Sequence, residues 1–134
     1  MTALTEAMAA KAFARAWNRL DPTDFIDLLD KDARYASQWV FEELIGKEAI
    51  ADYLMGKMQA VKALTVKSGG TIVFAELGTT SNGFPGRDCV FLAQGQNESV
   101  TAAVLFEVGG GRIRRYDLCM SELLDVDRSG IYPI

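Results

Sequence analysis

The sequence predicts an α+β fold in which helices come first and an antiparallel sheet follows. Apolar residues repeat at helical spacing up to about residue 64, and from about residue 71 the period changes to two. Short segments rich in glycine and asparagine separate the later strands, and strands joined by short turns pair antiparallel. With 134 residues, 49% of them hydrophobic and 24% charged, the chain has the composition of one globular domain, which we place over residues 1–134.

Two helices are predicted at the N-terminus. The first spans residues 3–20 and has an apolar face at helical spacing, formed by Leu4, Met8, Phe13, Ala16, Trp17 and Leu20. The second begins at Asp21-Pro22, because an aspartate caps the N–H groups of a first turn and a proline fits the first helical position. We expect it to end near Asp30.

An extended segment and a long third helix come next. Residues 33–44 alternate like a strand, with Tyr35, Ser37, Trp39 and Phe41 on one side. The helix begins at Gly46 and carries apolar residues at helical spacing, which are Ile50, Tyr53, Leu54, Met58 and Val61. Gly56 lies inside this helix, where a glycine costs roughly 1 kcal/mol relative to alanine, so we expect close packing or a ligand there.

Four strands are predicted in the second half, over residues 71–79, 87–94, 98–108 and 112–120. In the first of them Glu76 follows Ile72 and Phe74 on one face. Its carboxylate therefore either faces a pocket or reaches water near the strand end. Residues 121–134 have no single pattern, but the last four, Ile131 to Ile134, are apolar enough to need a place to pack.

The composition argues against several classes of protein. A net charge of −4 repels phosphate groups, so we expect no nucleic-acid partner. No apolar run reaches membrane-spanning length, and Glu6 and Lys11 interrupt any signal peptide, so we expect a cytoplasmic protein without a membrane partner. The chain has no histidine, which removes the commonest general base and metal ligand, and we expect no metal site.

The two cysteines, Cys89 and Cys119, both lie in strand-like runs. We expect buried thiols in a reducing compartment. A disulfide would be possible only if their strands were neighbours.

The order of elements, together with four short motifs, resembles the nuclear transport factor 2-like superfamily and, within it, the SnoaL-like branch. The motifs are F-x-x-x-W-N-x-L-D at Phe13 to Asp21, L-L-D-K-D-A-R-Y at Leu28 to Tyr35, G-K-E-A-I at Gly46 to Ile50, and G-R-I-R-R-Y-D at Gly111 to Asp117. That branch includes polyketide cyclases, ketosteroid isomerases and limonene epoxide hydrolases. The resemblance implies a cone-shaped, curved antiparallel sheet wrapped around N-terminal helices, a cystatin-like α+β barrel. It also implies an apolar cavity for a small apolar molecule, no cofactor, and a homodimer formed through the sheet.

Site residues follow from the same resemblance. Related enzymes carry an acidic residue for proton transfer near the position of Asp117, and a carboxylate in an apolar cavity is desolvated in a way that suits this task. Arg115 or Tyr35 would then stabilise developing negative charge. The remaining residues expected to line the cavity are Trp17, Trp39, Tyr53, Met58, Phe74, Glu76 and Cys119.

The alternation of the last strand leaves the role of Asp117 open. Arg115, Asp117 and Cys119 share one face, and the opposite face, with Tyr116, Leu118 and Met120, is the more apolar. Asp117 faces a cavity only if the apolar set faces a dimer partner; otherwise it pairs with an arginine and ties the sheet. Two functions stay open: an acid/base isomerase, cyclase, dehydratase or hydrolase using Asp117, or a non-catalytic ligand-binding or protein-interaction module of the same fold.

Overall fold

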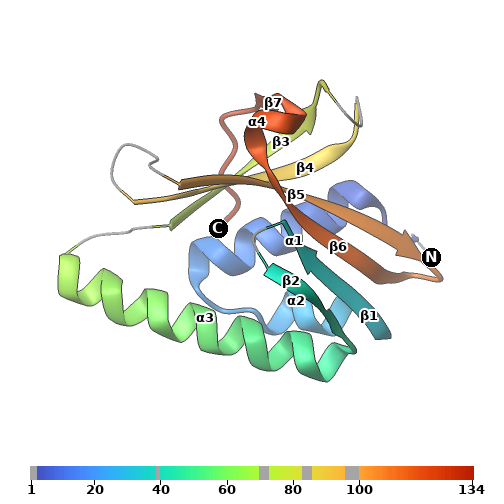
Figure 1. Ribbon diagram of the computed structural model, residues 1–134, viewed down its shortest axis with the longest axis horizontal. Coiled ribbons are helices and arrows are strands. Elements are labelled where there is room, and N and C mark those ends of the chain that lie inside the picture. Colours follow the sequence, from blue (N-terminus) through green and yellow to red (C-terminus); the bar gives the residue numbers. More distant parts are fainter. Residues whose placement is uncertain (1–2, 39, 70–72, 83–85, 96–99) are drawn as a thin grey trace.

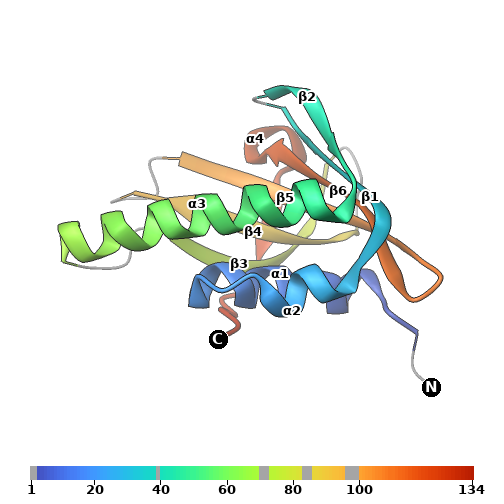
Figure 2. The same cartoon turned by 90° about the horizontal axis from the view of Figure 1, so that it is seen from below.

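The computed structural model describes residues 3–38, 40–69, 73–82, 86–95 and 100–134. In this part of the chain the elements are α1 (Glu6–Arg19), α2 (Thr23–Leu28), β1 (Leu29–Ser37), β2 (Val40–Ile45), α3 (Lys47–Ser68), β3 (Val73–Thr80), β4 (Asp88–Gln94), β5 (Val100–Gly109), β6 (Arg112–Met120), α4 (Ser121–Leu124) and β7 (Val126–Arg128). The predicted α+β class is confirmed. Helices α1, α2 and α3 lie on one side of a curved sheet, and α4 lies on the other (Figures 1 and 2).

The seven strands form one sheet in the order β2-β1-β6-β5-β4-β3-β7. The meander from β3 to β6 is antiparallel, as predicted. Two details differ. The extended segment at residues 33–44 is a hairpin of two strands, and β1 pairs with β6 in parallel, because the long connection through α3 and the meander brings the last strand beside the first. Since β2 and β7 are the two edges, the sheet curves without closing into a barrel.

The main core lies between the three helices and the inner face of the sheet. Helix α1 contributes an inner face that includes Phe13, and the buried face of α3 includes Leu54 and Met58. Strands β5 and β6 add Phe106 and Tyr116 from the opposite layer. The Asp21 carboxylate accepts the Thr23 N–H at 3.1 Å at the start of α2, but Pro22 is the N-cap residue and not the first helical residue that the sequence predicted.

A smaller cluster lies on the outer face of the sheet, where Leu124 of α4 covers Cys89 and Cys119. Strand β5 separates the two cysteines, since Cys89 is opposite Leu105 and Cys119 is opposite Ala103. Strands lie about 4.8 Å apart, so the cysteine Cα atoms are about 10 Å apart, beyond the reach of a disulfide. Burial raises the pKa of Cys89 to about 12, as expected for an inert thiol.

Candidate functional site

Strand β6 presents opposite chemistry on its two faces. Tyr116 is 1% exposed and packs in the main core, with Leu118 against the same core. Arg115 and Asp117 lie on the other face, and Cys119 continues that face into the outer cluster. The more apolar set of the last strand therefore faces the helices.

Aromatic rings gather around Tyr116 on the inner side of the sheet. Its ring stacks on Tyr35 of the neighbouring strand, with centroids 4.5 Å apart, and Tyr35 contacts Tyr53 of α3 at 5.5 Å. Three phenylalanine rings approach Tyr116 at 5.5, 5.3 and 6.1 Å, and these are Phe13, Phe25 and Phe106. The tyrosines come from β1, β6 and α3, so the site is built by the helical layer and the sheet together.

Two buried hydrogen-bond donors in the main core have no partner among the described residues. They are the hydroxyl of Tyr116 and the indole Nε1–H of Trp17. Burial raises the pKa of Tyr116 well above its usual value, so the hydroxyl keeps its proton. The pKa of Tyr35 is also raised, mainly by burial and to a smaller extent by the electrostatic effect of Tyr53. Buried polar groups in folded proteins nearly always have a partner, so the lack of one at these two donors needs an explanation.

The outer face carries ion pairs instead. The Arg115 guanidinium donates to the carboxylate of Asp117 at 2.9 Å and to that of Glu43 at 2.7 Å. These side chains are about one-third exposed, at 32%, 31% and 29% respectively. Hydrogen bonding to Asp117 raises the pKa of Arg115 further above its usual value, so the arginine keeps its charge.

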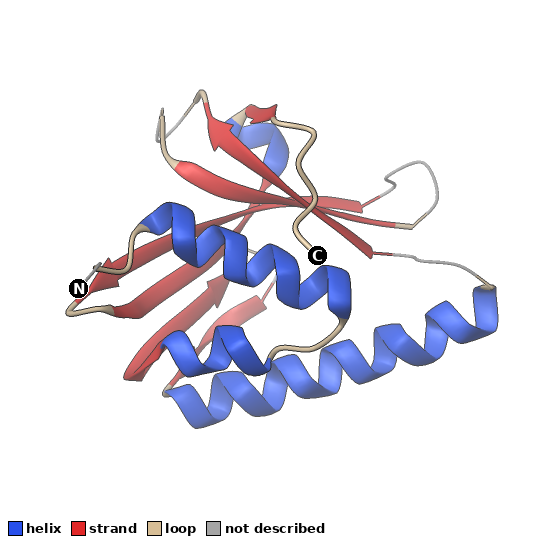
Figure 3. Ribbon diagram, turned by 180° about the vertical axis from the view of Figure 1, so that it is seen from behind, coloured by secondary structure: helices blue, strands red, loops and turns tan. Residues whose placement is uncertain are grey.

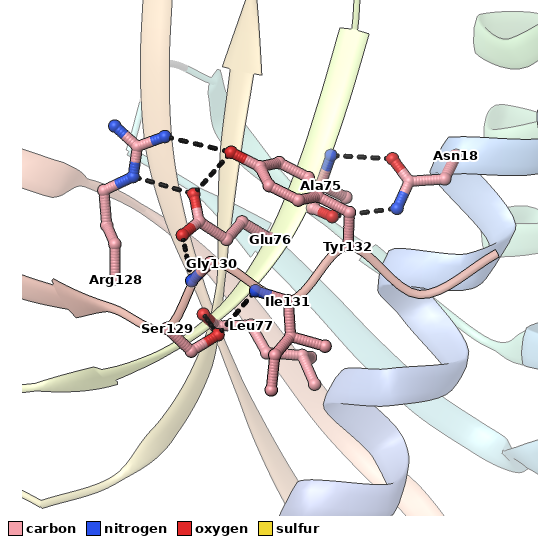
Figure 4. A network of polar contacts seen from close by, with 9 residues as sticks. All are labelled: Asn18, Ala75, Glu76, Leu77, Arg128, Ser129, Gly130, Ile131 and Tyr132. Atoms are coloured by element: carbon pink, nitrogen blue, oxygen red, sulfur yellow. Dashed lines mark hydrogen bonds and ion pairs between the residues drawn. The ribbon is translucent and has the colours of Figure 1, made fainter.

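Glu76 also lies on the outer side and is 3% exposed. Its carboxylate accepts hydrogen bonds from Arg128 Nε at 2.7 Å, the Gly130 N–H at 2.7 Å and the Tyr132 hydroxyl at 3.0 Å (Figure 4). Burial alone would raise the pKa of Glu76, but these hydrogen bonds outweigh it and lower the pKa below the usual value. The carboxylate is thus enclosed by the C-terminal segment.

Comparison with known proteins identifies the family. The SnoaL-like domain matches residues 10–116. The chain belongs to the SnoaL-like family. No curated protein sequence matches this SnoaL-like chain.

Solved structures resemble this SnoaL-like chain over most of its length. A candidate polyketide cyclase from Sinorhizobium meliloti is 18% identical and has a TM-score of 0.55. The match covers 80% of this chain and 89% of the cyclase chain. An uncharacterized cystatin fold protein from Novosphingobium aromaticivorans is 16% identical, with 86% and 97% covered and a TM-score of 0.57. A steroid delta-isomerase from Pseudomonas aeruginosa is 15% identical, with 88% and 82% covered and a TM-score of 0.52. At these identities the likeness establishes the fold.

The structure divides the predicted site residues of the SnoaL-like chain between the two sides of the sheet. Four lie in or against the main core, which are Trp17, Tyr35, Tyr53 and Met58. Five lie on the outer side, which are Phe74, Glu76, Arg115, Asp117 and Cys119. Trp39 lies outside the described residues.

Tyr116 was not among the predicted site residues, although the alternation of the last strand had placed it in the apolar set. A tyrosine between apolar neighbours on an inward-facing strand was the available signal, because its hydroxyl needs a partner when the ring is buried.

A separate open groove of about 1080 Å³ lies between α2, β1 and the first turns of α3. Its walls carry both signs of charge, including Lys31, Asp32, Lys47 and Asp52. None of the predicted site residues that the structure describes lines it. None of the described helices is long and apolar enough to cross a membrane.

Proposed function

We propose that this SnoaL-like protein binds a small, mostly apolar molecule that carries a hydrogen-bond acceptor, on the inner side of its sheet. The observation that carries the proposal is a pair of buried neutral donors in the main core, Tyr116 Oη and Trp17 Nε1, which have no partner in the described part of the chain. Aromatic rings around Tyr116 supply flat apolar contact, and the donors supply orientation, which is the usual division of labour in small-molecule sites.

The charge distribution narrows the ligand to a neutral compound. Among the described residues Glu76 is the one charged side chain that is fully buried, and it lies on the outer side of the sheet. A charged ligand on the inner side would lose its hydration without gaining a buried counter-ion. The ligand class is therefore a neutral ketone, ester or lactone. Two of the similar structures bear names that refer to polyketide and steroid chemistry, which accords with such a ligand.

Titration calorimetry with two matched probes, 2-acetylnaphthalene and 2-ethylnaphthalene, tests the proposal. The ketone should bind more tightly than the hydrocarbon, because only the ketone accepts a hydrogen bond. Tyr116→Phe should remove this preference, by about five-fold in affinity for a net hydrogen bond of about 1 kcal/mol. Tyr132→Phe removes a hydroxyl from the outer side and is the matched control. Equal affinity for both probes in the unmodified protein would contradict the proposal.

Catalysis by Asp117 stays a prediction from the family resemblance. The Asp117 carboxylate is held by Arg115 on the face opposite Tyr116. For this reason we propose ligand binding as the function and treat isomerase, cyclase, dehydratase or hydrolase activity as the alternative. Asp117→Asn separates them, since it would abolish turnover of an enzyme that depends on this carboxylate but leave ketone binding unchanged.

We also propose a homodimer through the outer face of the sheet. Phe74 is 44% exposed on that face, and the Arg115 and Asp117 pair is only partly covered. Exposed aromatic area and charged groups of both signs on the same face of the sheet suit a self-complementary contact. Light scattering should give a dimer mass for the unmodified protein and a monomer mass for Phe74→Asp. A monomer at every protein concentration would overturn this assembly and leave the ligand proposal untouched.

A further inference from the structure

The C-terminal segment, residues 126–134, covers the edge of the sheet at β3. Strand β7 pairs with only three β3 residues, from Gly78 to Thr80. Beyond β7 the segment continues along the same edge, because the Leu77 N–H donates to the Ile131 carbonyl at 2.9 Å and the Ser129 N–H donates to the Leu77 carbonyl at 3.1 Å. The segment therefore behaves as one added strand.

The edge is shaped for this strand. At Gly78 a Cβ atom would lie 2.8 Å from the Val126 Cγ1 and 3.0 Å from the Asp127 carbonyl oxygen, so only a glycine allows the approach. Glu76 beside it is enclosed and accepts from Arg128, Gly130 and Tyr132 of the segment (Figure 4). The Arg128 guanidinium also lies 4.3 Å from the ring centroid of Phe91.

Polar contacts, more than apolar burial, hold the segment. Figure 3 shows it passing from the sheet to α1, where the Asn18 side-chain amide donates to the Pro133 carbonyl at 2.7 Å. Yet Ile131, Tyr132 and Ile134 are 57%, 42% and 78% exposed, and only Pro133 in residues 129–134 is buried. Because burial of apolar surface supplies most folding stability, a segment held in this way opens more readily than the core.

A residue in the left-handed conformation precedes the segment. Asp125, directly before β7, has φ +53°, a left-handed conformation that a non-glycine residue adopts at a cost. Opening at Asp125 would relieve that conformation. It would leave Leu77 without its backbone partners and Glu76 without its donors. Only a strand with an equivalent arginine restores both sets of contacts.

We propose that residues 126–134 are a displaceable strand and that the β3 edge beneath them is a docking site for the same segment of a second copy of this chain. The fit of the segment to the edge, through Gly78, Glu76 and Asn18, is the complementarity that selects this partner. Exchange of an identical element between two copies recreates every contact of the single chain, so it has a low free-energy cost.

The test uses the full-length chain and a fluorescent synthetic peptide with the sequence of residues 126–134. Fluorescence anisotropy measures peptide binding. Arg128→Ala in the chain weakens the contacts of its own segment but leaves Glu76 and the β3 edge intact. The unmodified peptide should therefore bind to the Arg128→Ala chain roughly ten-fold more tightly than to the unmodified chain. Tyr132→Phe removes only one hydroxyl, serves as the milder variant, and should strengthen binding by a smaller factor. Arg114→Ala changes an exposed arginine of β6 and should behave like the unmodified chain.

A peptide in which alanine replaces the arginine should bind roughly ten-fold more weakly to every chain, because Glu76 then lacks its donor. Two results would overturn the proposal. One is the absence of peptide binding to both the Arg128→Ala and the Tyr132→Phe chains. The other is equal binding to the unmodified, Arg128→Ala and Arg114→Ala chains, since the edge would then not be the site.

Discussion

The inner and outer faces of the sheet differ in whether their polar side chains have partners. On the outer face two carboxylates have cationic partners, since Asp117 is paired with Arg115 and Glu76 with Arg128. On the inner face the rings are tightly grouped, while the Tyr116 hydroxyl and the Trp17 indole lack a partner within the described chain.

The difference separates polar groups that stabilise the fold from polar groups that we propose bind a ligand. Ion pairs with both members present are complete, and they serve the sheet and the C-terminal segment. A buried donor without an acceptor is costly to folding, so its presence needs an explanation, and the explanation that we propose here is a bound ligand.

The largest expected effect comes from deleting an inner ring. Phe13 is 2% exposed and contacts Phe25 at 5.0 Å and Phe106 at 5.5 Å, so Phe13→Ala should lower the free energy of unfolding by about 3–5 kcal/mol. Phe74→Ala, at a ring that is 44% exposed on the outer face, should lower it by less than about 1 kcal/mol. Urea denaturation of both variants checks the difference, and equal losses would mean that the inner cluster is not the core.

The next effect concerns the buried carboxylate of the outer face. Glu76 has a folded pKa below its usual value of 4.5, so its contribution to stability is complete above that pH and is lost as the pH falls through the folded pKa. Glu76→Gln should lower the free energy of unfolding by about 2 kcal/mol at neutral pH, since charge-assisted hydrogen bonds are lost. Below pH 4.5 the difference from the unmodified protein should shrink. Urea denaturation at each pH measures this difference in the free energy of unfolding. A difference that stays constant as the pH falls would contradict the assignment.

A smaller effect of opposite sign is expected at the inner donor. Tyr116→Phe keeps the ring in place and removes a buried hydroxyl without a partner in the described chain, so the unliganded protein should gain up to about 1 kcal/mol. The same substitution should weaken ketone binding, so stability and affinity move apart. Thermal denaturation with and without 2-acetylnaphthalene measures both. A loss of stability comparable to that of Phe13→Ala would show that the hydroxyl has a structural partner.

Much of the fold could be predicted from the sequence, because its signals are local. Helical spacing in α1 and alternation in β6, for which the predicted bounds of 112–120 match the structure, report which face of an element is apolar. The parallel pairing of β1 with β6 was missed, because it joins residues far apart in the sequence. Gly56 was expected to mark close packing or a ligand. Close packing is wrong, because Gly56 is exposed and no described atom outside its own helix backbone lies within 4 Å of the position of a Cβ.

The candidate site was harder to predict for a physical reason. Alternation gives two faces of β6 without saying which one the helices cover, and that choice decides between Asp117 and Tyr116. The sequence left this choice open, and in the structure the more apolar face, with Tyr116 and Leu118, is the inner one. The donors of Glu76 lie more than fifty residues away in a tail without a pattern, so no spacing rule links Arg128 or Tyr132 to that carboxylate.

The smallest effect is expected at Asp117. Its carboxylate is 31% exposed and is bonded to an arginine that also binds Glu43, so Asp117→Asn leaves Arg115 with a charged partner. The free energy of unfolding should fall by less than about 1 kcal/mol, and the loss should disappear in about 1 M salt, which screens partly exposed charges. Arg115→Ala removes the shared partner of both carboxylates and should cost more than Asp117→Asn at low salt. If Asp117→Asn instead costs as much as Glu76→Gln and does so independently of salt, Asp117 is enclosed in the native protein, as a covering second subunit on the outer face would cause.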